Sequence, residues 1–443
     1  MKHRMHLRRF FAAAAFTLLS TSLHAQPIAE AAKALAGKLP KGGIVTGEQT
    51  TGSVPSFAAA GSLGLADTPP EKVLFEIGSI TKVFTGLLLA QAVTEGKVTL
   101  DTTIKDLMGD KAAIADPQLA ATTLKQLATH TSGLPTQPDN LIVLVQGKMD
   151  EDPYSNYDRD KLLAYLKTAR LSGKPPFKES YSNLGVGLLG YLLAQLYDKP
   201  WVDLVRDKIT GPLGMKDTSV LLTAEQQKRF AQGFRVGGDP ASHWNARPAA
   251  LVGCGGLRST ASDMLRFGAA LLEPEKTPLK EAIALLLQAQ NKSSPTRETC
   301  LCLVRSTLNG KVIYWHNGQT GGFHSMLRVE PETKTVQVAL GNIADGRVGE
   351  VITGSKPVPP SLAAYEGTYM VFPGINYTVQ WREGALQFMV SHQAFLPLTP
   401  GKAPDTFEIK AVPAEVVFSR KNDKVIGVTL KQSGREIPAV RVE

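Results

Sequence analysis

The sequence predicts an α/β fold, in which an antiparallel sheet is flanked by helices and carries an all-helical insert, followed by a small, barrel-like all-β domain. Strand-type patterns occupy residues 44–64 and 73–77 and return between 301 and 340. Helical patterns, separated by loops with proline and glycine, fill residues 101–248. Strands on both sides of a helical middle indicate one sheet that is assembled from both ends of the chain.

The last part of the chain changes to short β-type runs with turn residues between them, which predicts a barrel or a curled sheet. Six strands are expected there, at residues 367–371, 377–381, 386–390, 406–409, 416–419 and 425–430.

Residues 1–25 have the three parts of a secretory signal peptide. A basic stretch without acidic residues is followed by an apolar stretch at 10–19 and a short polar end that closes at Ala25. We expect cleavage there and a mature protein in a bacterial-type periplasm or outside the cell. The apolar stretch is too short for a permanent membrane-spanning helix, so we expect no stable membrane insertion. An uncleaved anchor stays open, because Leu23 is large for its place three residues before the cut.

Length and composition favour a globular protein of two or three domains. The chain has 443 residues, of which 43% are hydrophobic and 20% charged, values that are ordinary for a folded protein. The net charge of +9 comes without a basic run interleaved with aromatic residues, so we expect no nucleic-acid partner.

We place the main domain at 26–355, a stiff proline-rich linker at 356–360 and the all-β domain at 361–443. The oligomeric state stays open.

The sharpest local motif is Ser79-Ile80-Thr81-Lys82, at the point where a strand pattern changes to a helix pattern. Apolar residues cover so much of the helix expected over 79–95 that it must be nearly buried. Residues three apart share a helical face, so the Ser79 hydroxyl and the Lys82 amine come within hydrogen-bond reach. Such a pair supplies a nucleophile and a proton acceptor, and the helix N-terminus supplies backbone N–H groups for an oxyanion.

Two further motifs carry groups that suit acyl transfer. Tyr181 and Asn183 precede an apolar helix pattern, where a phenol can relay protons and an amide can orient a lysine or a substrate carbonyl. Residues 316–322 follow a strand pattern, and their glycines let a substrate backbone lie alongside while Gln319 offers a second oxyanion N–H. Taken singly, the two motifs also fit a helix cap and a hairpin turn.

Together the three motifs resemble the penicillin-recognising serine hydrolases, and most closely the class C β-lactamase branch, which also contains D-alanyl-D-alanine carboxypeptidases and esterases. The segment 75–86, with the sequence FEIGSITKVFTG, is similar to the nucleophile segment of that branch almost throughout. Residues 127–135 also resemble the family. The resemblance covers roughly residues 40–350, and the three motifs follow the family's order around a helical insert.

The resemblance implies an acyl-enzyme mechanism that needs no cofactor. Ser79 would be the acylated nucleophile, with Lys82 and Tyr181 moving protons, and the backbone N–H groups of Ser79 and Gln319 would form the oxyanion hole. The substrate would be a small β-lactam, a peptide or an ester. We expect β-lactamase activity first, with carboxypeptidase or esterase activity as the alternative. The resemblance assigns substrate binding to Gln137, Asn183, His316, Asn317 and Gly318.

One position departs from the β-lactamases of this family, which usually have lysine where this chain has His316. An unperturbed imidazole has a pKa of about 6.5 and is mostly neutral at pH 7. We therefore expect a weaker hold on a substrate carboxylate. Activity towards an anionic substrate should then fall between about pH 6 and 8 more than activity towards a neutral ester.

Two other classes of protein stay open. A zinc-dependent hydrolase would need scattered histidines to converge, namely His130, His243, His316 and His324. No metal-ligand spacing supports such a site, so we expect no metal. A penicillin-binding sensor without turnover would use the same serine motif, with the all-β domain as its interaction module.

The three cysteines, Cys254, Cys300 and Cys302, allow one disulfide in an oxidising compartment. In a strand, Cys300 and Cys302 would point to the same face. A bridge from Cys254 to either of them and three free, buried thiols are both compatible with the sequence.

Overall fold

The computed structural model describes residues 27–442, except 110–112, 142–143, 146–147, 150–151, 153, 245–248, 309, 355–358, 373–374, 383–384, 391–394, 410–411 and 433. The signal peptide expected at 1–25 and most of the linker expected at 356–360 lie outside the described residues. The chain divides into two compact units. The first runs to residue 143 and resumes over 150–352, and the second comprises 144–149 and 353–443. No helix among the described residues is long and apolar enough to cross a membrane.

The first unit contains a large sheet and two groups of helices. Its strands are β1 (Gly43–Thr50), β2 (Ser56–Gly61), β3 (Phe75–Glu76), β6 (Arg258–Ser259), β7 (Asn291–Ser294), β8 (Arg297–Thr299), β9 (Val304–Leu308), β10 (Lys311–Gln319), β11 (His324–Glu330) and β12 (Thr335–Gly341). Its helices are α2 (Thr81–Thr94), α3 (Ile104–Met108), α4 (Pro117–Ala120), α5 (Leu124–Ala128), α6 (Arg159–Thr168), α7 (Asn183–Leu196), α8 (Trp201–Val205), α9 (Ala224–Gln227), α10 (Ala261–Leu272), α11 (Lys280–Leu286) and α12 (Arg347–Thr353).

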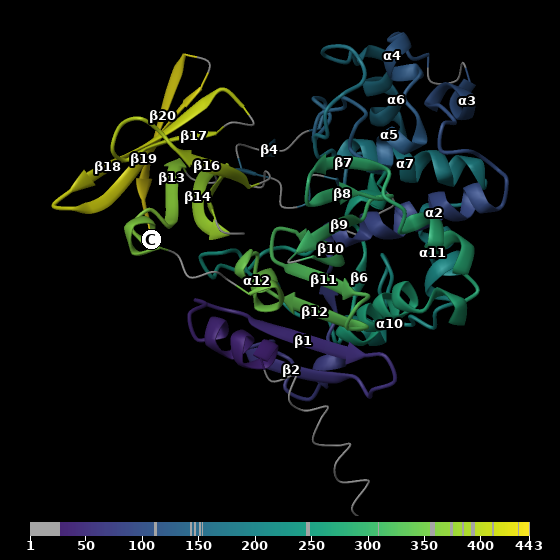
Figure 1. The fold of residues 1–443 in the computed structure, drawn as a ribbon, viewed down its shortest axis with the longest axis horizontal. Helices are drawn as coiled ribbons and strands as arrows, with labels where there is room; N and C mark the ends of the chain where they lie inside the picture. The colour runs from purple at the N-terminus through teal and green to yellow at the C-terminus, as the bar shows by residue number, and fades with distance from the viewer. Residues whose placement is uncertain are drawn as a thin grey trace, which may run out of the picture. The chain divides into compact units, whose positions relative to one another are not determined.

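Strands from both ends of the first unit form one antiparallel sheet of eight strands, in the order β2-β1-β12-β11-β10-β9-β8-β7 (Figure 1). Ile44 of β1 pairs with Gly341 of β12, and Gly43 N donates to Asn342 Oδ1 across 299 residues of chain. The antiparallel sheet predicted from the sequence is therefore confirmed, together with the helical segments that lie between its strands in the chain.

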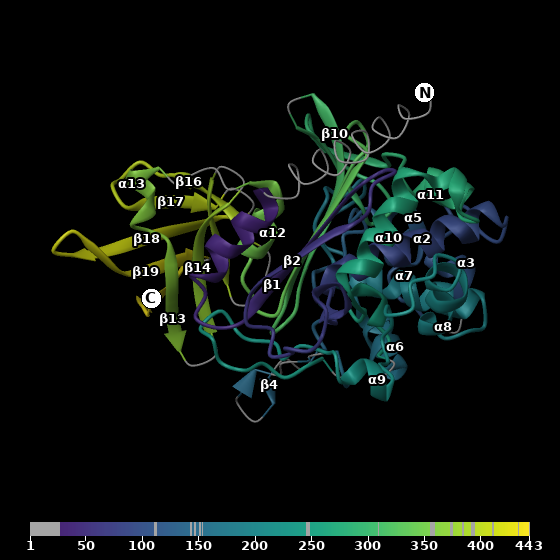
Figure 2. The same cartoon turned by 90° about the horizontal axis from the view of Figure 1, so that it is seen from below.

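Helices cover both faces of the sheet because its side chains alternate between two cores (Figure 2). Val336, Val338 and Leu340 of β12 join the main core, which also contains α2, α7 and α10. Ala339, between them, joins a smaller core beneath α12. The sheet is thus a layer between helices, as the α/β prediction requires.

Helix α2 is enclosed over most of its length, since every residue from Thr81 to Ala92 is buried. A 3-10 turn, η2 (Gly78–Ile80), leads into it. Gly86 faces the chain segment before β9, where a Cβ would lie 2.0 Å from the Leu301 carbonyl oxygen. Only glycine allows this approach. The buried helix predicted over 79–95 is confirmed, except that its first residues form a 3-10 turn instead of an α-helical one.

The strand pattern predicted from residue 301 is wrong at its start, since β9 begins at Val304. Cys302 has a φ of 60°, outside the strand region, and its N–H donates to the Ala128 carbonyl at 2.9 Å. Cys254, Cys300 and Cys302 are all buried, free thiols.

The second unit contains a closed antiparallel barrel, which confirms the barrel-like prediction (Figure 1). β13 pairs with β20 and closes it. Aromatic side chains fill its core, namely Tyr365, Tyr369, Tyr377, Phe388, Phe407 and Phe418. Its strands are β13 (Gly367–Phe372), β14 (Ile375–Arg382), β15 (Ala385–Val390), β16 (Leu396–Pro400), β17 (Thr406–Ile409), β18 (Ala414–Lys421), β19 (Lys424–Gln432) and β20 (Arg435–Arg441). The helix α13 (Pro360–Ala363) and the short hairpin of β4 (Leu144–Val145) and β5 (Lys148–Met149) also belong to this unit.

The sequence prediction missed two barrel strands, β16 and β20. Each contains proline, which cannot donate to a neighbouring strand and so weakens a strand pattern. In the barrel, Pro397 lies opposite Gln387 and Pro438 lies opposite Thr429.

Titration of the thiols tests the arrangement of the cysteines. Three free thiols should react per chain when the protein is unfolded without a reductant, because no pair of them is bonded. Ellman's reagent measures this number, and a value of one would mean that a disulfide forms.

Candidate active site

Ser79 lies where the buried strand β3 gives way to η2 and α2. Lys82, at the start of α2, is fully buried, and its Nζ donates to Ser79 Oγ at 2.9 Å. The same Nζ donates to the carbonyl oxygen of Cys254 at 2.5 Å, at the end of the short turn η5 (Val252–Cys254). A buried amine is costly unless it is hydrogen-bonded, so these two acceptors hold it against the serine.

The ring of Tyr181 lies beside the same amine, with Lys82 Nζ 5.0 Å from the ring centroid. Tyr181 ends the loop before α7, and Ser182 caps that helix. The Tyr181 carbonyl accepts a hydrogen bond from Thr136 Oγ1 at 3.1 Å, which ties the loop to the segment after α5. The structure therefore brings together Ser79, Lys82 and Tyr181, the three residues to which the sequence analysis gave catalytic roles.

Two glycines allow β10 to touch the serine turn. A Cβ on Gly318 would lie 1.9 Å from the Ile77 carbonyl oxygen and 2.8 Å from Ser79 N. A Cβ on Gly78, whose φ is +48°, would lie 2.7 Å from Gln319 N. Neither place has room for a side chain, and the backbone N–H groups of Ser79 and Gln319 are thereby brought close to each other.

His316 lies on β10 and is buried. Its Nδ1 is 2.5 Å from the Asn317 carbonyl oxygen, so Nδ1 carries the proton and Nε2 is an acceptor. Burial, and then the nearby Lys82, lower the pKa of His316 to about 3. The expectation of a change in the charge of His316 between pH 6 and 8 is therefore wrong, because burial keeps the ring neutral across that range.

The remaining predicted binding residues border the same loops. Gln137 Nε2 donates to the Tyr154 hydroxyl at 2.5 Å, and the segment that carries Gln137 is bonded to the start of α7. Asn183 is the first residue of α7, and its N–H donates to the Thr136 carbonyl at 3.0 Å. Asn317 lies within β10.

Two other histidines border the site. His130 has a φ of 59°, its ring centroid lies 4.6 Å from that of Tyr181, and its Nδ1 accepts from Ser182 N at 3.1 Å. Burial, and then Lys82, lower the pKa of His130 well below its usual range, so the ring is neutral. His324 Nδ1 lies 3.3 Å from Gln319 Oε1.

Within the described part of the chain, no three His, Cys, Asp or Glu side chains are arranged to hold a metal ion.

Glu179, two residues before Tyr181, is a residue of this site that the sequence analysis missed. Its carboxylate ties the loop of Tyr181 to the β7–β8 edge of the sheet, and no local pattern signals this because the donors lie more than 110 residues away. The donors are Asn291 Nδ2 at 2.9 Å, Thr299 Oγ1 at 2.8 Å, the Arg297 guanidinium at 3.1 Å and the Ser293 hydroxyl.

A buried ion pair beneath the serine turn was also missed. Glu76 of β3 lies opposite Arg258 of β6, with 3.9 Å between the carboxylate and the guanidinium. Burial raises the pKa of Glu76 to about 7, an effect that the charge of Arg258 only partly offsets. A charged residue between Phe75 and Ile77, both buried, was the signal available in the sequence.

A buried lysine bonded to a serine at the start of a helix, with a tyrosine and a strand edge beside it, defines a site of the serine-hydrolase kind on an α/β scaffold. The profile of the Beta-lactamase family matches residues 50–352, more than half of the chain. The protein belongs to this family, and the predicted resemblance to the penicillin-recognising serine hydrolases is confirmed.

Curated relatives include enzymes of both kinds expected from the motifs. The chain is 32% identical over 191 residues to D-alanyl-D-alanine-carboxypeptidase/endopeptidase AmpH of Escherichia coli (strain K12), covering 43% of this chain and 47% of the relative. It is 28% identical over 335 residues to penicillin-binding protein 4 of Amycolatopsis lactamdurans, covering 67% and 84%. It is 28% identical over 218 residues to a beta-lactamase of Pseudomonas fluorescens, covering 48% and 55%. The matches to the first and third relatives span only about half of their lengths.

Solved structures share the fold over about three quarters of this chain. A beta-lactamase from Sulfitobacter sp. EE-36 is similar with a TM-score of 0.62 and 24% identity, over 74% of this chain and 95% of that one. A beta-lactamase/D-alanine carboxypeptidase from Pseudomonas syringae is similar with a TM-score of 0.62 and 19% identity, over 75% and 99%.

The raised pKa of Glu76 predicts how stability depends on pH. Between about pH 4.5 and 7 the folded protein keeps a proton on Glu76 that the unfolded chain releases, so the free energy of unfolding falls as the pH rises. The loss is about 3 kcal/mol in all and is complete only above about pH 8, one unit beyond the pKa of the folded state. Glu76→Gln cannot ionise and should lose less stability between pH 5 and 8.

Urea unfolding at pH 5 and pH 8, followed by tryptophan fluorescence, measures this difference. Three of the four tryptophans, Trp201, Trp244 and Trp315, lie in the first unit. An equal loss of stability in Glu76→Gln and the unchanged protein would show that Glu76 is not the group responsible.

Proposed function

We propose that this protein is a hydrolase that works through an acyl-enzyme on Ser79. The observation that carries the proposal is the hydrogen bond of 2.9 Å between Lys82 Nζ and Ser79 Oγ, in a buried setting beside the Tyr181 ring. A serine hydroxyl is a weak nucleophile until a neighbouring group takes its proton. In this proposal, Lys82 and Tyr181 take that role.

The reaction would proceed in two displacements. Ser79 Oγ attacks the substrate carbonyl carbon while its proton is relayed through Lys82 and Tyr181 towards the leaving atom. The carbonyl oxygen takes up the negative charge between the N–H groups of Ser79 and Gln319. The bond to the leaving nitrogen or oxygen then breaks, and the leaving atom takes the proton. Water attacks the ester, the bond to Oγ breaks, and the proton of the water returns to Ser79. No step requires a cofactor.

Strand β10 offers an edge on which a substrate backbone could lie. β9 pairs with β10 only as far as Trp315, whereas β11 pairs with it to Gln319. Among the described residues, the side of 316–319 away from β11 therefore has no strand partner. An extended substrate could bind there through the backbone. The proposed binding residues Gln137 and Asn183 lie on two segments that are hydrogen-bonded to each other.

The substrate class follows from the family and from His316. Opening of a β-lactam ring remains the first proposal, which the match to the Beta-lactamase family supports. One observation favours the esterase part of the carboxypeptidase/esterase alternative, because a neutral ester carries no carboxylate, whereas a carboxypeptidase substrate ends in one. His316 is neutral and presents an acceptor at Nε2, so it cannot pair with a substrate carboxylate as a lysine would.

We further propose that the protein acts in the periplasm or outside the cell, which rests on the signal-peptide pattern of residues 1–25. A penicillin-binding sensor without turnover remains the competing role for the same serine. It differs in one step, since its acyl-enzyme would not be hydrolysed.

Replacement of the serine tests the nucleophile. The unchanged protein should gain the mass of benzylpenicillin and then lose it, whereas Ser79→Ala should not be labelled, because it lacks the proposed nucleophile. Intact-mass spectrometry over time measures both steps. Labelling of Ser79→Ala would contradict the assignment, and a stable adduct on the unchanged protein would favour the sensor.

A permanent cation on β10 tests the role of His316. His316→Lys should raise kcat/KM for an anionic β-lactam about tenfold relative to a neutral ester, because a charged donor replaces a neutral acceptor. In the unchanged protein, the pH profiles for the two substrates should run parallel between about pH 6 and 8, because the pKa of His316 lies far below that range. Steady-state kinetics on the two substrates measures both effects, and profiles that diverge would show that His316 titrates there.

A further inference from the structure

The carboxylate of Glu179 attaches the loop of Tyr181 to one end of the sheet. Residues 172–176 of this loop are exposed, whereas the side chain of Glu179 is only 14% exposed, because it turns towards the β7–β8 hairpin. Its Oε1 accepts from the Arg297 guanidinium at 3.1 Å. Its Oε2 accepts from three neutral donors of the same hairpin, namely the side chains of Asn291, Ser293 and Thr299. Hydrogen bonds to an ionised group are stronger than neutral ones, so this contact exceeds an ordinary surface ion pair.

The β7–β8 hairpin continues across the sheet to the strand beside the nucleophile. Thr299 of β8 pairs with Val304 of β9, and Val304 pairs with Trp315 of β10. From there, β10 runs on to the residues that touch the serine turn. Glu179 therefore connects the Tyr181 loop to the strand that supplies the second proposed oxyanion N–H.

Backbone hydrogen bonds attach the same loop to the helical side of the unit. The N–H groups of Ser180 and Ser182, on either side of the tyrosine, donate to His130, at its carbonyl oxygen (2.8 Å) and its Nδ1 (3.1 Å). Tyr181 is thus held by the helical side through its neighbours in the chain, and by the sheet through Glu179. The two attachments together set where the tyrosine lies between helices and sheet.

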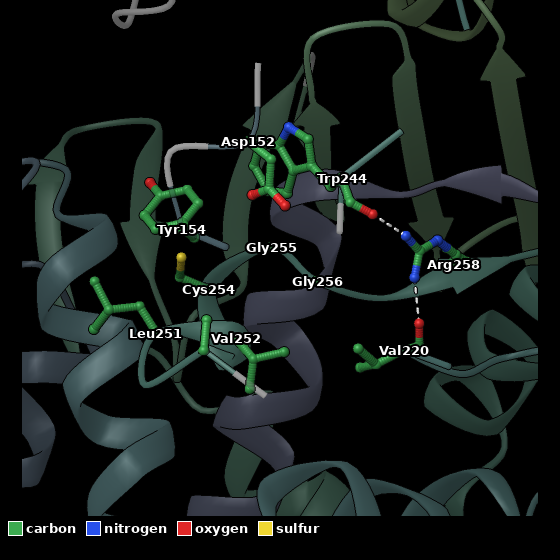
Figure 3. A pocket seen from close by; sticks show the side chains of 11 residues that line it. Asp152, Tyr154, Val220, Trp244, Leu251, Val252, Cys254, Gly255, Gly256 and Arg258 are labelled. Carbon is green, nitrogen blue, oxygen red and sulfur yellow. Dashed lines mark hydrogen bonds between the residues drawn. The ribbon is translucent and has the colours of Figure 1, made fainter. Parts of the chain in front are cut away.

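The serine turn is held differently, by contacts inside the core. Arg258 lies on β6, whose partner β3 leads into that turn, and it donates to the carbonyl oxygens of Val220 and Trp244 (Figure 3). Arg258 and Val220 are both buried. The loop of Tyr181 is attached nearer to the surface, so a change at Glu179 can move the tyrosine without moving the nucleophile.

We propose that Glu179 is a positioning residue, which sets the place of the Tyr181 hydroxyl relative to Ser79 by anchoring the loop between them to the sheet. A side chain transfers a proton only across a hydrogen-bond distance, so a displacement of about 1 Å can lower a rate about a hundredfold. Glu179 acts on the reaction through Tyr181 alone. This inference rests on the proposed acyl-enzyme of Ser79.

The leaving group of the substrate should reveal this role. In the proposed mechanism, Tyr181 helps to relay a proton towards the leaving atom. A leaving group that is stable as an anion needs little of this help, whereas a basic one departs slowly unless it is protonated. A displaced Tyr181 should therefore slow substrates with a basic leaving group most, while a general loss of folded protein would slow all substrates equally.

Glu179→Gln is the sharpest change, because it keeps the size of the side chain and removes its charge. An amide nitrogen cannot accept a hydrogen bond. In either orientation of the amide, its NH2 group would face donors, namely the Arg297 guanidinium or the three groups now bonded to Oε2. The variant should therefore loosen the anchor of the loop and leave its other contacts in place.

The experiment measures kcat/KM for phenyl acetate and p-nitrophenyl acetate on the full-length protein. The two esters form the same acyl-enzyme and differ only in the leaving group, of which phenolate is the more basic. Glu179→Gln should lower kcat/KM about tenfold for phenyl acetate and at most about threefold for p-nitrophenyl acetate. An equal loss on both esters, or no loss on either, would overturn the inference.

A matched control lies on the same hairpin. Glu298 forms an ion pair with Arg305 of β9, and neighbouring residues of a strand point to opposite faces, so this pair lies on the face of β8 away from Arg297. Glu298→Gln removes a comparable charge without touching the Tyr181 loop. It should leave kcat/KM for both esters within about twofold of the unchanged protein.

A double-mutant cycle shows whether Glu179 acts through the tyrosine. Tyr181→Phe should lower kcat/KM for phenyl acetate about a hundredfold. Adding Glu179→Gln should then cause less than about a twofold further loss, because no hydroxyl is left to misplace. Losses that multiply would overturn the inference. If Glu179→Gln does not fold, Asn291→Ala removes one of the four donors and should give a smaller loss, about threefold, with the same preference between the esters.

The inference and the proposed function fail in different ways. Hydrolysis that requires Ser79 but is unchanged by Glu179→Gln would overturn the role of Glu179 alone. Hydrolysis that persists in Ser79→Ala would overturn the proposed function and, with it, this inference.

Discussion

The hydrogen bonds of the buried Lys82 amine constrain most of the arrangement around it. An amine placed inside a helix that is buried on all sides is costly unless acceptors meet it, and the two that do come from Ser79 and from Cys254, 172 residues further along the chain. The turn η5 therefore has to lie against α2. The glycines at 78 and 318 then let the backbone of β10 approach the serine turn closely.

Much of the fold could be predicted from the sequence because its signals are local. The all-round apolar pattern of α2, the switch from strand to helix at Ser79 and the helical middle all depend on neighbours in the chain. The strand β20 could not be predicted, because Pro438 hides a pattern that only its partners in the barrel complete. The start of β9 was predicted wrongly for a related reason. A hydrogen bond from the Cys302 N–H to the Ala128 carbonyl, 174 residues away, holds the chain outside a strand conformation there.

The site shows the same division between local and distant causes. Ser79, Lys82 and Tyr181 lie in short sequence motifs, so their proximity in the fold could be predicted. Glu179 and the pair of Glu76 and Arg258 could not, because each acts through partners that lie far along the chain. The charge state of His316 could not be predicted from the sequence either, because it depends on burial beside Lys82, and no motif indicates that burial.

The pairing of β1 with β12 has a consequence for how the chain folds. The two strands meet across 299 residues, and every strand between β12 and β7 in the sheet is synthesised after the helical segments. A topology with such distant contacts folds slowly, because a very long loop has to close before the hydrogen bonds of the sheet can form and stabilise it. Until β12 emerges, the edge of β1 stays open to other chains. The open edge of β1 is therefore a place where the incomplete chain is exposed to association with other chains before the sheet is finished.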